Sequence, residues 1–470
     1  MPSQSARALR WRDAVAEWWS GAWRWVLMAG GVLVAVRLLL DAKGANGVAM
    51  AVAISALVVG VVLTSSKPMA IALIATPALF VTQRLDIAAA GIAVSDVALA
   101  AGLGTAVLLG QRDYSRPLRQ LLWANLLYQF ATLFTVIVNP QAANTIEWFH
   151  AWLLVSGALI FGWALGRSGS ARLALALMVI ACLVIAAGTI FTAVFSYYLV
   201  GQFAPVYPTW PWEMHKNAAG TLMSFGLLIL YVNPQWSRFP TGLARAGIMI
   251  LAIAIIMTQS RQAMIGLIVA ILLVVARSGR TGRSLWTFLL AIPGAVLIVA
   301  TVIDQIESQN EFNSFFQRVD WMRELYAQWK LAPVFGHGLR YWYYNPSIPY
   351  QPPQAEFEVA TSAGIVGLLA FAVMWVVVIL VLWRIDPLYG TLAVAATLSR
   401  IVQAQFDLFW VAAQVSVPFA IAGICLGAMA RGTPKSAGLD IGAVQSVPRT
   451  GGTSAASGVD IFSGRRPHTG

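Results

Sequence analysis

Residues 364–383 of the 470-residue chain read GIVGLLAFAVMWVVVILVLW, twenty residues in succession without a charge. A helix of that length rises about 30 Å, which matches the hydrocarbon core of a bilayer. The stretch therefore predicts a transmembrane helix, and similar apolar runs recur from about residue 25 to residue 429. The runs are continuous and do not alternate, which excludes the pattern of a transmembrane β-barrel.

The composition supports the same class. Hydrophobic residues make up 59% of the chain and charged residues 11%, whereas a soluble domain is about half apolar and about a quarter charged. We predict an all-α polytopic transmembrane bundle of 12 to 14 spans. The candidate spans are 25–40, 47–64, 68–83, 87–109, 119–138, 148–165, 171–195, 217–232, 243–259, 261–277, 285–303, 364–383, 388–404 and 408–429.

The net charge of +12 indicates membrane topology rather than a nucleic-acid partner. Lys and Arg concentrate in alternate loops, for example at Arg112, Arg172 and Arg280, and cytoplasmic loops are the ones enriched in these residues. We therefore expect a multi-pass protein of the plasma membrane with both termini in the cytoplasm. Nucleic acid is not expected to bind.

Five segments follow from this topology. A basic, aromatic N-terminal segment is expected to lie at the inner membrane face, and a tail rich in Gly, Ser, Thr and Pro is expected to be disordered. The predicted segments are 1–24 (cytoplasmic), 25–303 (transmembrane bundle), 304–363 (large external loop), 364–431 (C-terminal spans) and 432–470 (cytoplasmic tail).

The external loop is too long to be a mere connection. Apolar residues recur in it at helical spacing, and Pro333 ends the pattern. This predicts an amphipathic helix that lies on the outer membrane face, in contact with lipids. The apolar positions are Phe315, Phe316, Val319, Met322, Tyr326 and Trp329.

Four cations lie on the predicted outer side, where the charge bias of the loops does not account for them: Lys216, Arg261, Arg318 and Arg340. Arg binds phosphate oxygens in a bidentate manner and Lys acts as a point charge, so the set suits a diphosphate. The alternative is that they pair with the nearby acids Glu213, Asp320, Glu356 or Glu358 and only hold the loop in place.

Four residues on the same side are candidate general bases: His215, His337, Glu356 and Glu358. The alternative is that they are ordinary surface residues. Tyr341 and Trp342 suit stacking on sugar rings, although an interfacial aromatic belt explains them equally well. The four histidines and two cysteines show no metal-ligand spacing, so we expect neither a metal nor another cofactor.

Six short motifs stand in order between residues 90 and 410: Ser95-Asp96, His215–Gly220, Thr258–Ala263, Arg318 with Trp321, Pro333–Gly338 and Ala363–Leu368. Together they resemble the O-antigen ligase and O-antigen polymerase superfamily of bacterial membrane glycosyltransferases. One departure concerns the His-Asn pair that ligases of this family carry about eleven residues before the span that follows the loop. Here Pro353 and Gln354 stand in that place.

The resemblance implies a metal-independent inverting glycosyltransferase of surface polysaccharide biosynthesis. Its donor would be a glycan on a polyprenyl pyrophosphate, and its acceptor another glycan or a lipid-linked glycan. The missing His-Asn pair leaves ligation and polymerisation both open. The alternative from a different class is a transporter of polyprenyl-linked sugars or other anionic solutes, although the few intramembrane charges do not favour it.

Overall fold

The computed structural model describes residues 67–85, 92–201, 203–278, 314–344 and 354–432, with isolated positions between 26 and 64 and between 296 and 303. In these ranges the elements are helices, apart from one isolated bridge between Arg84 and Ala93. The predicted all-α class is confirmed. The segment 1–24, the tail from 433, and most of the candidate spans 25–40, 47–64 and 285–303 lie outside the described residues.

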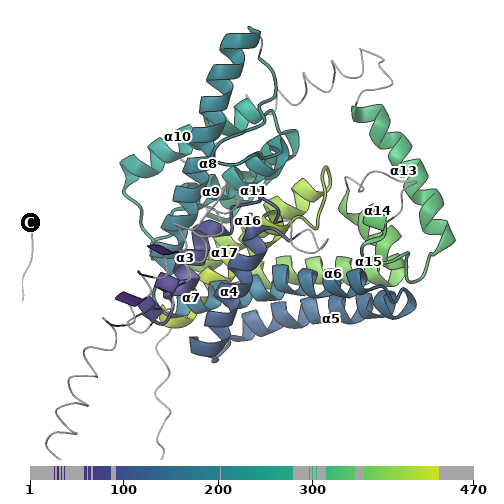
Figure 1. Ribbon diagram of the computed structural model, residues 1–470, viewed down its shortest axis with the longest axis horizontal. Coiled ribbons are helices and arrows are strands. Elements are labelled where there is room, and N and C mark those ends of the chain that lie inside the picture. The colour runs from purple at the N-terminus through teal and green to yellow at the C-terminus, as the bar shows by residue number, and fades with distance from the viewer. Residues whose placement is uncertain are drawn as a thin grey trace, which may run out of the picture. The chain divides into compact units, whose positions relative to one another are not determined.

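Six described helices are long and apolar enough to cross a membrane, so the protein is a multi-pass membrane protein. Two shorter apolar helices, α4 and α9, accompany them, and the count of 12 to 14 spans stays a prediction. Figure 1 labels the helices: α3 (Ala70–Ala78), α4 (Val94–Leu109), α5 (Arg116–Val138), α6 (Ala142–Trp152), α7 (Ala158–Arg167), α8 (Ala171–Val200), α9 (Lys216–Val232), α10 (Thr241–Thr258), α11 (Arg261–Ser278), α13 (Ser314–Leu331), α14 (Tyr341–Tyr344), α15 (Ala355–Arg384), α16 (Pro387–Ala404) and α17 (Ala412–Gly432).

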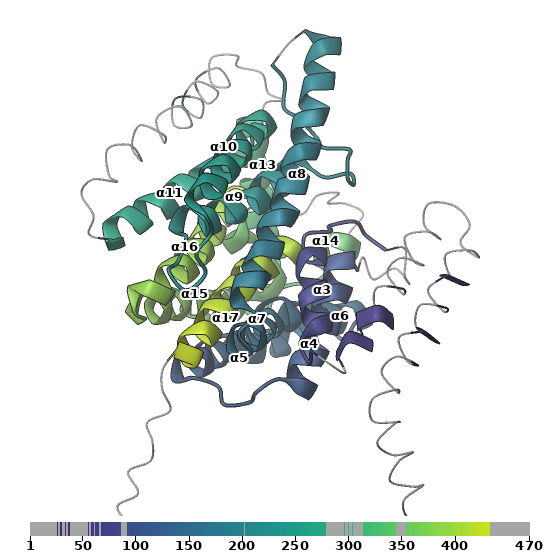
Figure 2. The ribbon, with the colours of Figure 1, turned by 90° about the vertical axis from the view of Figure 1, so that its left-hand side faces the viewer.

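The described core centres on α9, in which every residue from Ala218 to Leu230 is buried. Near it, α17 packs along α7 at very short range (Figure 2). A Cβ atom on Gly162 would lie 2.1 Å from the carbonyl oxygen of Ala420, and one on Gly427 would lie 2.4 Å from that of Trp163. Small residues let membrane helices approach this closely, so Gly162 and Gly427 are packing residues of the α7–α17 contact.

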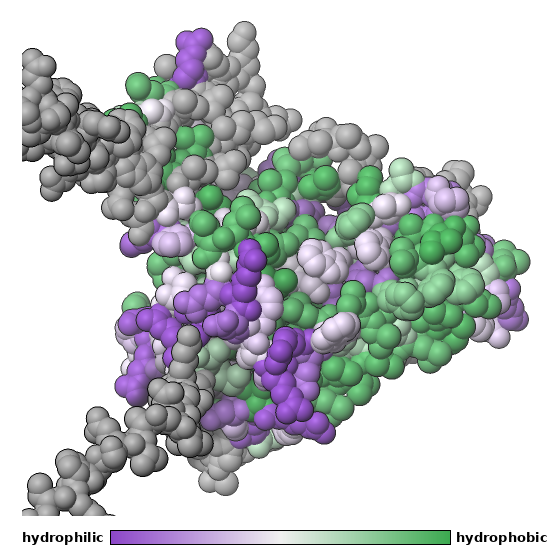
Figure 3. Space-filling model, turned by 90° about the horizontal axis from the view of Figure 1, so that it is seen from below, coloured by the Kyte–Doolittle hydropathy of each residue, from purple (hydrophilic) through white to green (hydrophobic). Residues whose placement is uncertain are grey.

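A broad hydrophobic surface covers much of the face shown in Figure 3, and hydrophilic side chains border it. Helix α5 alone exposes Trp123, Phe130 and Ile137 by 58% or more. Such a surface is stable against lipid and unfavourable in water. The exposed apolar side chains therefore support a membrane-embedded bundle.

Loops that the charge pattern assigns to one side contact one another. On the predicted cytoplasmic side, Arg167 Nη1 donates to the carbonyl of Ala430 at 2.9 Å. On the predicted outer side, Val206 N–H donates to Met257 O at 3.2 Å. These contacts support the alternation of sides, while the orientation in a membrane stays a prediction.

Two helices begin earlier than predicted. The candidate span 148–165 is part of a helical run from Ala142 to Arg167, in which five residues, 153–157, form a π-helical turn between α6 and α7. The first turns of this run contain the polar residues Asn144 and Glu147, which are not typical of a span. Helix α15 begins at Ala355, so the end of the predicted loop is helical, although its backbone breaks at Gly364, where the span was predicted to start.

Candidate functional site

The turn Pro333–Gly338 is joined to the break in α15 through backbone atoms. Gly364 has φ 66° and ψ −168°, which interrupts the hydrogen bonds of the helix. The turn satisfies the interrupted groups: the N–H groups of His337 and Gly338 each donate at 3.0 Å, to Thr361 O and Ser362 O respectively. In return, the Ile365 N–H donates to Pro333 O at 2.8 Å. The turn Pro333–Gly338 is thus fixed to helix α15.

Two glycines make this contact possible. Gly336 and Gly364 both have positive φ, and a Cβ on either would lie within 2.3 Å of a backbone carbonyl oxygen of the other segment. Residues with a side chain rarely adopt such a backbone. The predicted motifs Pro333–Gly338 and Ala363–Leu368 are therefore two halves of one joint.

The joint places Arg340 against α6. The Arg340 N–H donates to Asn144 Oδ1 at 2.9 Å, and its guanidinium Nε donates to Glu147 Oε2 at 2.9 Å. Glu147 Oε1 lies 3.2 Å from His150 Nδ1, and His150 Nε2 lies 3.1 Å from Asp96 Oδ1. Each ring nitrogen of His150 therefore faces a carboxylate, an arrangement that favours the imidazolium form.

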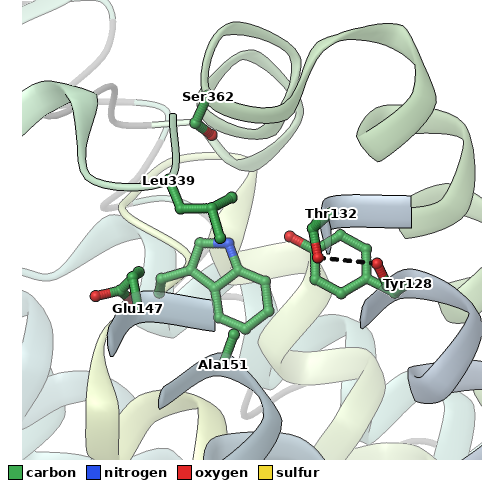
Figure 4. A pocket seen from close by; sticks show the side chains of 7 residues that line it. Tyr128, Thr132, Glu147, Ala151, Leu339 and Ser362 are labelled. Atoms are coloured by element: carbon green, nitrogen blue, oxygen red, sulfur yellow. Dashed lines mark hydrogen bonds between the residues drawn. The ribbon is translucent and has the colours of Figure 1, made fainter. Parts of the chain in front are cut away.

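This network lines a cavity of about 80 Å³ between α4, α6, the segment after the joint and the loop 405–411. By the same measure, one water needs about 10–15 Å³, so the space can hold a ligand. A second cavity, of about 10 Å³, adjoins it and shares Glu147 and Trp410 in its lining. Figure 4 shows this smaller cavity, which Leu339 and Ala151 approach from opposite sides.

A second group of polar residues lies at the N-termini of α9 and α11. His215 caps α9, with its Nδ1 accepting from the Asn217 N–H at 3.3 Å. Ser260, directly before Arg261, donates through Oγ to Asn217 Oδ1 at 3.3 Å. The start of α9, where Lys216 lies, and the start of α11, where Arg261 lies, are thereby held side by side.

The ionisation of His215 is set by its surroundings. Partial burial lowers the pKa of the imidazole; the Asp407 carboxylate raises it by less, and the Lys216 ammonium lowers it again. The ring is therefore neutral at pH 7 and can accept a proton. Lys216 Nζ lies 5.8 Å from the centre of the Tyr207 ring, which also packs edge-on against His215.

The loop 405–411 lies between the two groups. Asp407 accepts a hydrogen bond from Gln262 Nε2 on α11, while Leu408 and Trp410 line the larger cavity. Glu358 and the fully buried Arg400 both bind the backbone of this loop at Phe409. The loop is therefore fixed in place. Asp407 contacts the group at the N-termini of α9 and α11, and Leu408 and Trp410 line the larger cavity.

The remaining predicted site residues have other surroundings. The Glu356 carboxylate accepts from Gln405 Nε2 at 2.7 Å, and the His337 ring stacks on Tyr341 at 4.5 Å between ring centres. Trp342 is 6% exposed and packs on Leu325 of α13. Arg318 belongs to α13, and its side chain lies outside the described atoms.

Sequence reasoning missed the acidic half of the cavity. Asp96 belongs to the motif Ser95-Asp96, whereas Glu147 and His150 belong to none of the motifs. They stand three residues apart at the start of an apolar helix, so they share one face. Ionisable residues in such a helix are themselves a sign of function. No feature of the sequence around Trp410 indicates a functional role.

The joint, Arg261 and helix α13 belong to one stretch of chain, residues 246–372. This stretch matches the O-antigen ligase family. The match takes in most of α10, then α11, α13, α14 and the first part of α15, and it covers just over a quarter of the chain. Asp96, Glu147, His150 and Trp410 lie outside it, so the cavity is formed by the O-antigen ligase segment together with residues before and after it. No curated protein matches the chain.

Proposed function

We propose that the protein is a glycosyltransferase at the outer face of the plasma membrane, which transfers or polymerises a glycan from a polyprenyl-pyrophosphate donor. The observation that carries the proposal is that the matched O-antigen ligase segment brings Arg261 beside Lys216, and Arg340 to a cavity. Polyprenyl pyrophosphate is already an activated leaving group, so neither a nucleotide nor a metal is required.

Lys216 and Arg261 are the residues best placed for the diphosphate. They begin two neighbouring helices, whose N-terminal dipoles and N–H groups favour an anion. Positive charge fixed there would stabilise the charge that develops on the diphosphate as it leaves. Arg340 is paired with Glu147, so it is better suited to position the segment around the cavity, and Arg318 stays a candidate for the diphosphate.

His215 is the favoured general base among the four candidates. It is neutral at pH 7, and it directly precedes Lys216. In the proposed step, an acceptor hydroxyl oxygen attacks the anomeric carbon with inversion, and the bond from that carbon to the diphosphate oxygen breaks. The hydroxyl proton passes to Nδ1 of His215, which gives up its hydrogen bond from the Asn217 N–H, and the polyprenyl pyrophosphate leaves. Glu358 is buried against the Phe409 N–H, which favours a structural role.

The test is to analyse surface glycans in a strain from which the gene is deleted and in the same strain after its return. Loss of the whole glycan would mean ligation, and glycan of single repeats would mean failed polymerisation. An unchanged glycan would refute the proposal. Purified protein in liposomes distinguishes the transporter alternative, because an enzyme forms a new glycosidic bond and a transporter only moves its solute.

A further inference from the structure

We propose that the larger cavity is a sugar subsite that binds one ring of the glycan, with Trp410 packed on the ring and the network of Asp96, His150, Glu147 and Arg340 bonded to its hydroxyl groups. The inference rests on the proposed function and deepens it. Neither the matched segment nor the cations for the diphosphate account for this cavity, since most of its polar lining lies before residue 246.

The charges of the lining select the ligand. Carboxylates of Asp96 and Glu147 accept hydrogen bonds, and the guanidinium of Arg340 and imidazolium of His150 donate them. A hydroxyl group both donates and accepts, so a sugar ring meets both kinds of partner. Arg84 lines the cavity as well, so two carboxylates face two guanidinium groups and one imidazole ring. A phosphate would face both carboxylates, and an apolar ligand would remove water from all of these groups without replacing its hydrogen bonds.

Trp410 supplies the apolar surface that a sugar needs. It is half-buried and lines the larger cavity, and Tyr128 stacks on it with ring centres 5.6 Å apart and an angle of 17° between the rings. The ring is thereby held in one orientation. The face of an aromatic ring carries partial negative charge and attracts the C–H groups on one side of a pyranose.

One short loop links the cavity to the proposed diphosphate site. Asp407, which is bonded to Gln262 next to Arg261, is three residues from Trp410. Three residues span at most about 11 Å between their Cα atoms. The sugar subsite and the diphosphate site therefore share the loop 405–411 as a common wall.

The experiment measures binding without transfer. The full chain in lipid nanodiscs is mixed with methyl glycosides of common hexoses, and saturation-transfer NMR reports which sugar protons contact the protein. We expect signals from ring C–H protons in the wild type and at least a fivefold loss in Trp410→Ala. Trp123→Ala, which removes an exposed indole on α5, is the matched control and should keep the full signal.

A second variant distinguishes loss of the subsite from misfolding of Trp410→Ala. Thr82→Trp would fill the cavity from the loop before α4 and leave Trp410 in place, and it should abolish the signal too. Equal signals in the wild type, Trp410→Ala and Thr82→Trp would overturn the subsite. Displacement of the glycosides by inorganic phosphate would overturn it as well, because it would indicate an anion site. Since no transfer is measured, sugar binding with an unchanged glycan in the deletion strain would refute the enzyme and leave the subsite standing.

Discussion

Glu358 and Arg400 bind the N–H and the carbonyl of the same residue, Phe409. Glu358 Oε2 accepts from the Phe409 N–H at 3.1 Å, and Arg400 Nη2 donates to the Phe409 carbonyl oxygen. Arg400 also donates through Nη1 to Gln414 Oε1 at 2.9 Å. The two side chains fix the loop that carries Asp407 on one side and Trp410 on the other.

Glu358 is either a general base or a residue that positions the loop at Phe409, and mutation can distinguish the two roles. In Glu358→Gln, the new amide oxygen can still accept from the Phe409 N–H, so a positioning role predicts transfer within about tenfold of the wild type. Loss of a general base would instead lower the rate by about 10²–10⁴. The measurement is the initial transfer rate. Glu358→Ala, which leaves the N–H without its acceptor, should also lose about 1–3 kcal/mol of stability.

Arg261 is expected to be essential for transfer and dispensable for folding. Arg261→Ala should abolish glycan transfer while the protein still inserts and purifies, because the diphosphate loses its bidentate partner. Arg261→Lys should restore only part of the rate. Expression level and melting temperature are measured beside the rate, and wild-type activity in Arg261→Ala would remove this residue from the site.

His215 predicts a specific dependence on pH. Because its pKa lies below the usual value of about 6.5, the base stays neutral at lower pH than usual, and the transfer rate should be flat from pH 7.5 to about 6.5 and fall below that. The folded protein binds a proton on His215 less tightly than the unfolded chain does. The contribution of His215 to the free energy of unfolding is therefore present above about pH 6.5 and lost as the pH falls through the folded pKa. The measurement is kcat/KM against pH.

The control for this profile is His215→Asn, because asparagine also caps helices well and should keep the start of α9 intact. It should lower the rate and remove the acid-side decline. The same decline in wild type and variant would show that another group titrates.

Gly364→Ala should destabilise the protein. At φ 66° and ψ −168° a residue with a side chain costs about 1–3 kcal/mol, and the new Cβ would lie 2.2 Å from Val334 O. We expect a lower melting temperature and loss of transfer. Gly104→Ala on α4 is the matched control, since nothing lies within 4 Å of its added Cβ and alanine favours a helix. Equal melting temperatures in both variants would contradict the joint.

The topology can be tested at two exposed positions. Arg112→Cys and Glu213→Cys place thiols in loops that the charge pattern assigns to opposite sides, while native Cys182 and Cys425 are buried. A membrane-impermeant maleimide added to spheroplasts should label position 213 and leave position 112 unlabelled until the membrane is opened. The reverse pattern would invert the orientation.

Most helices were within reach of the sequence, because long apolar runs are local signals. The backbone breaks at Gly364, where the span was predicted to start, and α13 ends at Leu331, before Pro333. The first turns of α6 were missed because Asn144 and Glu147 are polar, and only their distant partners explain them.

The cavity depends on contacts that no local pattern contains. Glu147 meets Arg340 across 193 residues of sequence, and each was predicted to lie in a separate loop. The sequence offered Glu356 and Glu358 as partners for the cations because they are near in the chain. Which acid a cation meets is decided by the packing of α5, α6 and α15, a property of the folded bundle.

The joint at Gly364 has a consequence for how such a protein can diversify. It is made of backbone groups, which every amino acid carries, so it fixes position without prescribing side chains beyond its two glycines. A segment of different sequence can therefore be attached at the same glycines and still place a residue in the larger cavity beside α6. The residues that recognise the ligand can change during evolution, while the backbone attachment to the membrane helix stays the same.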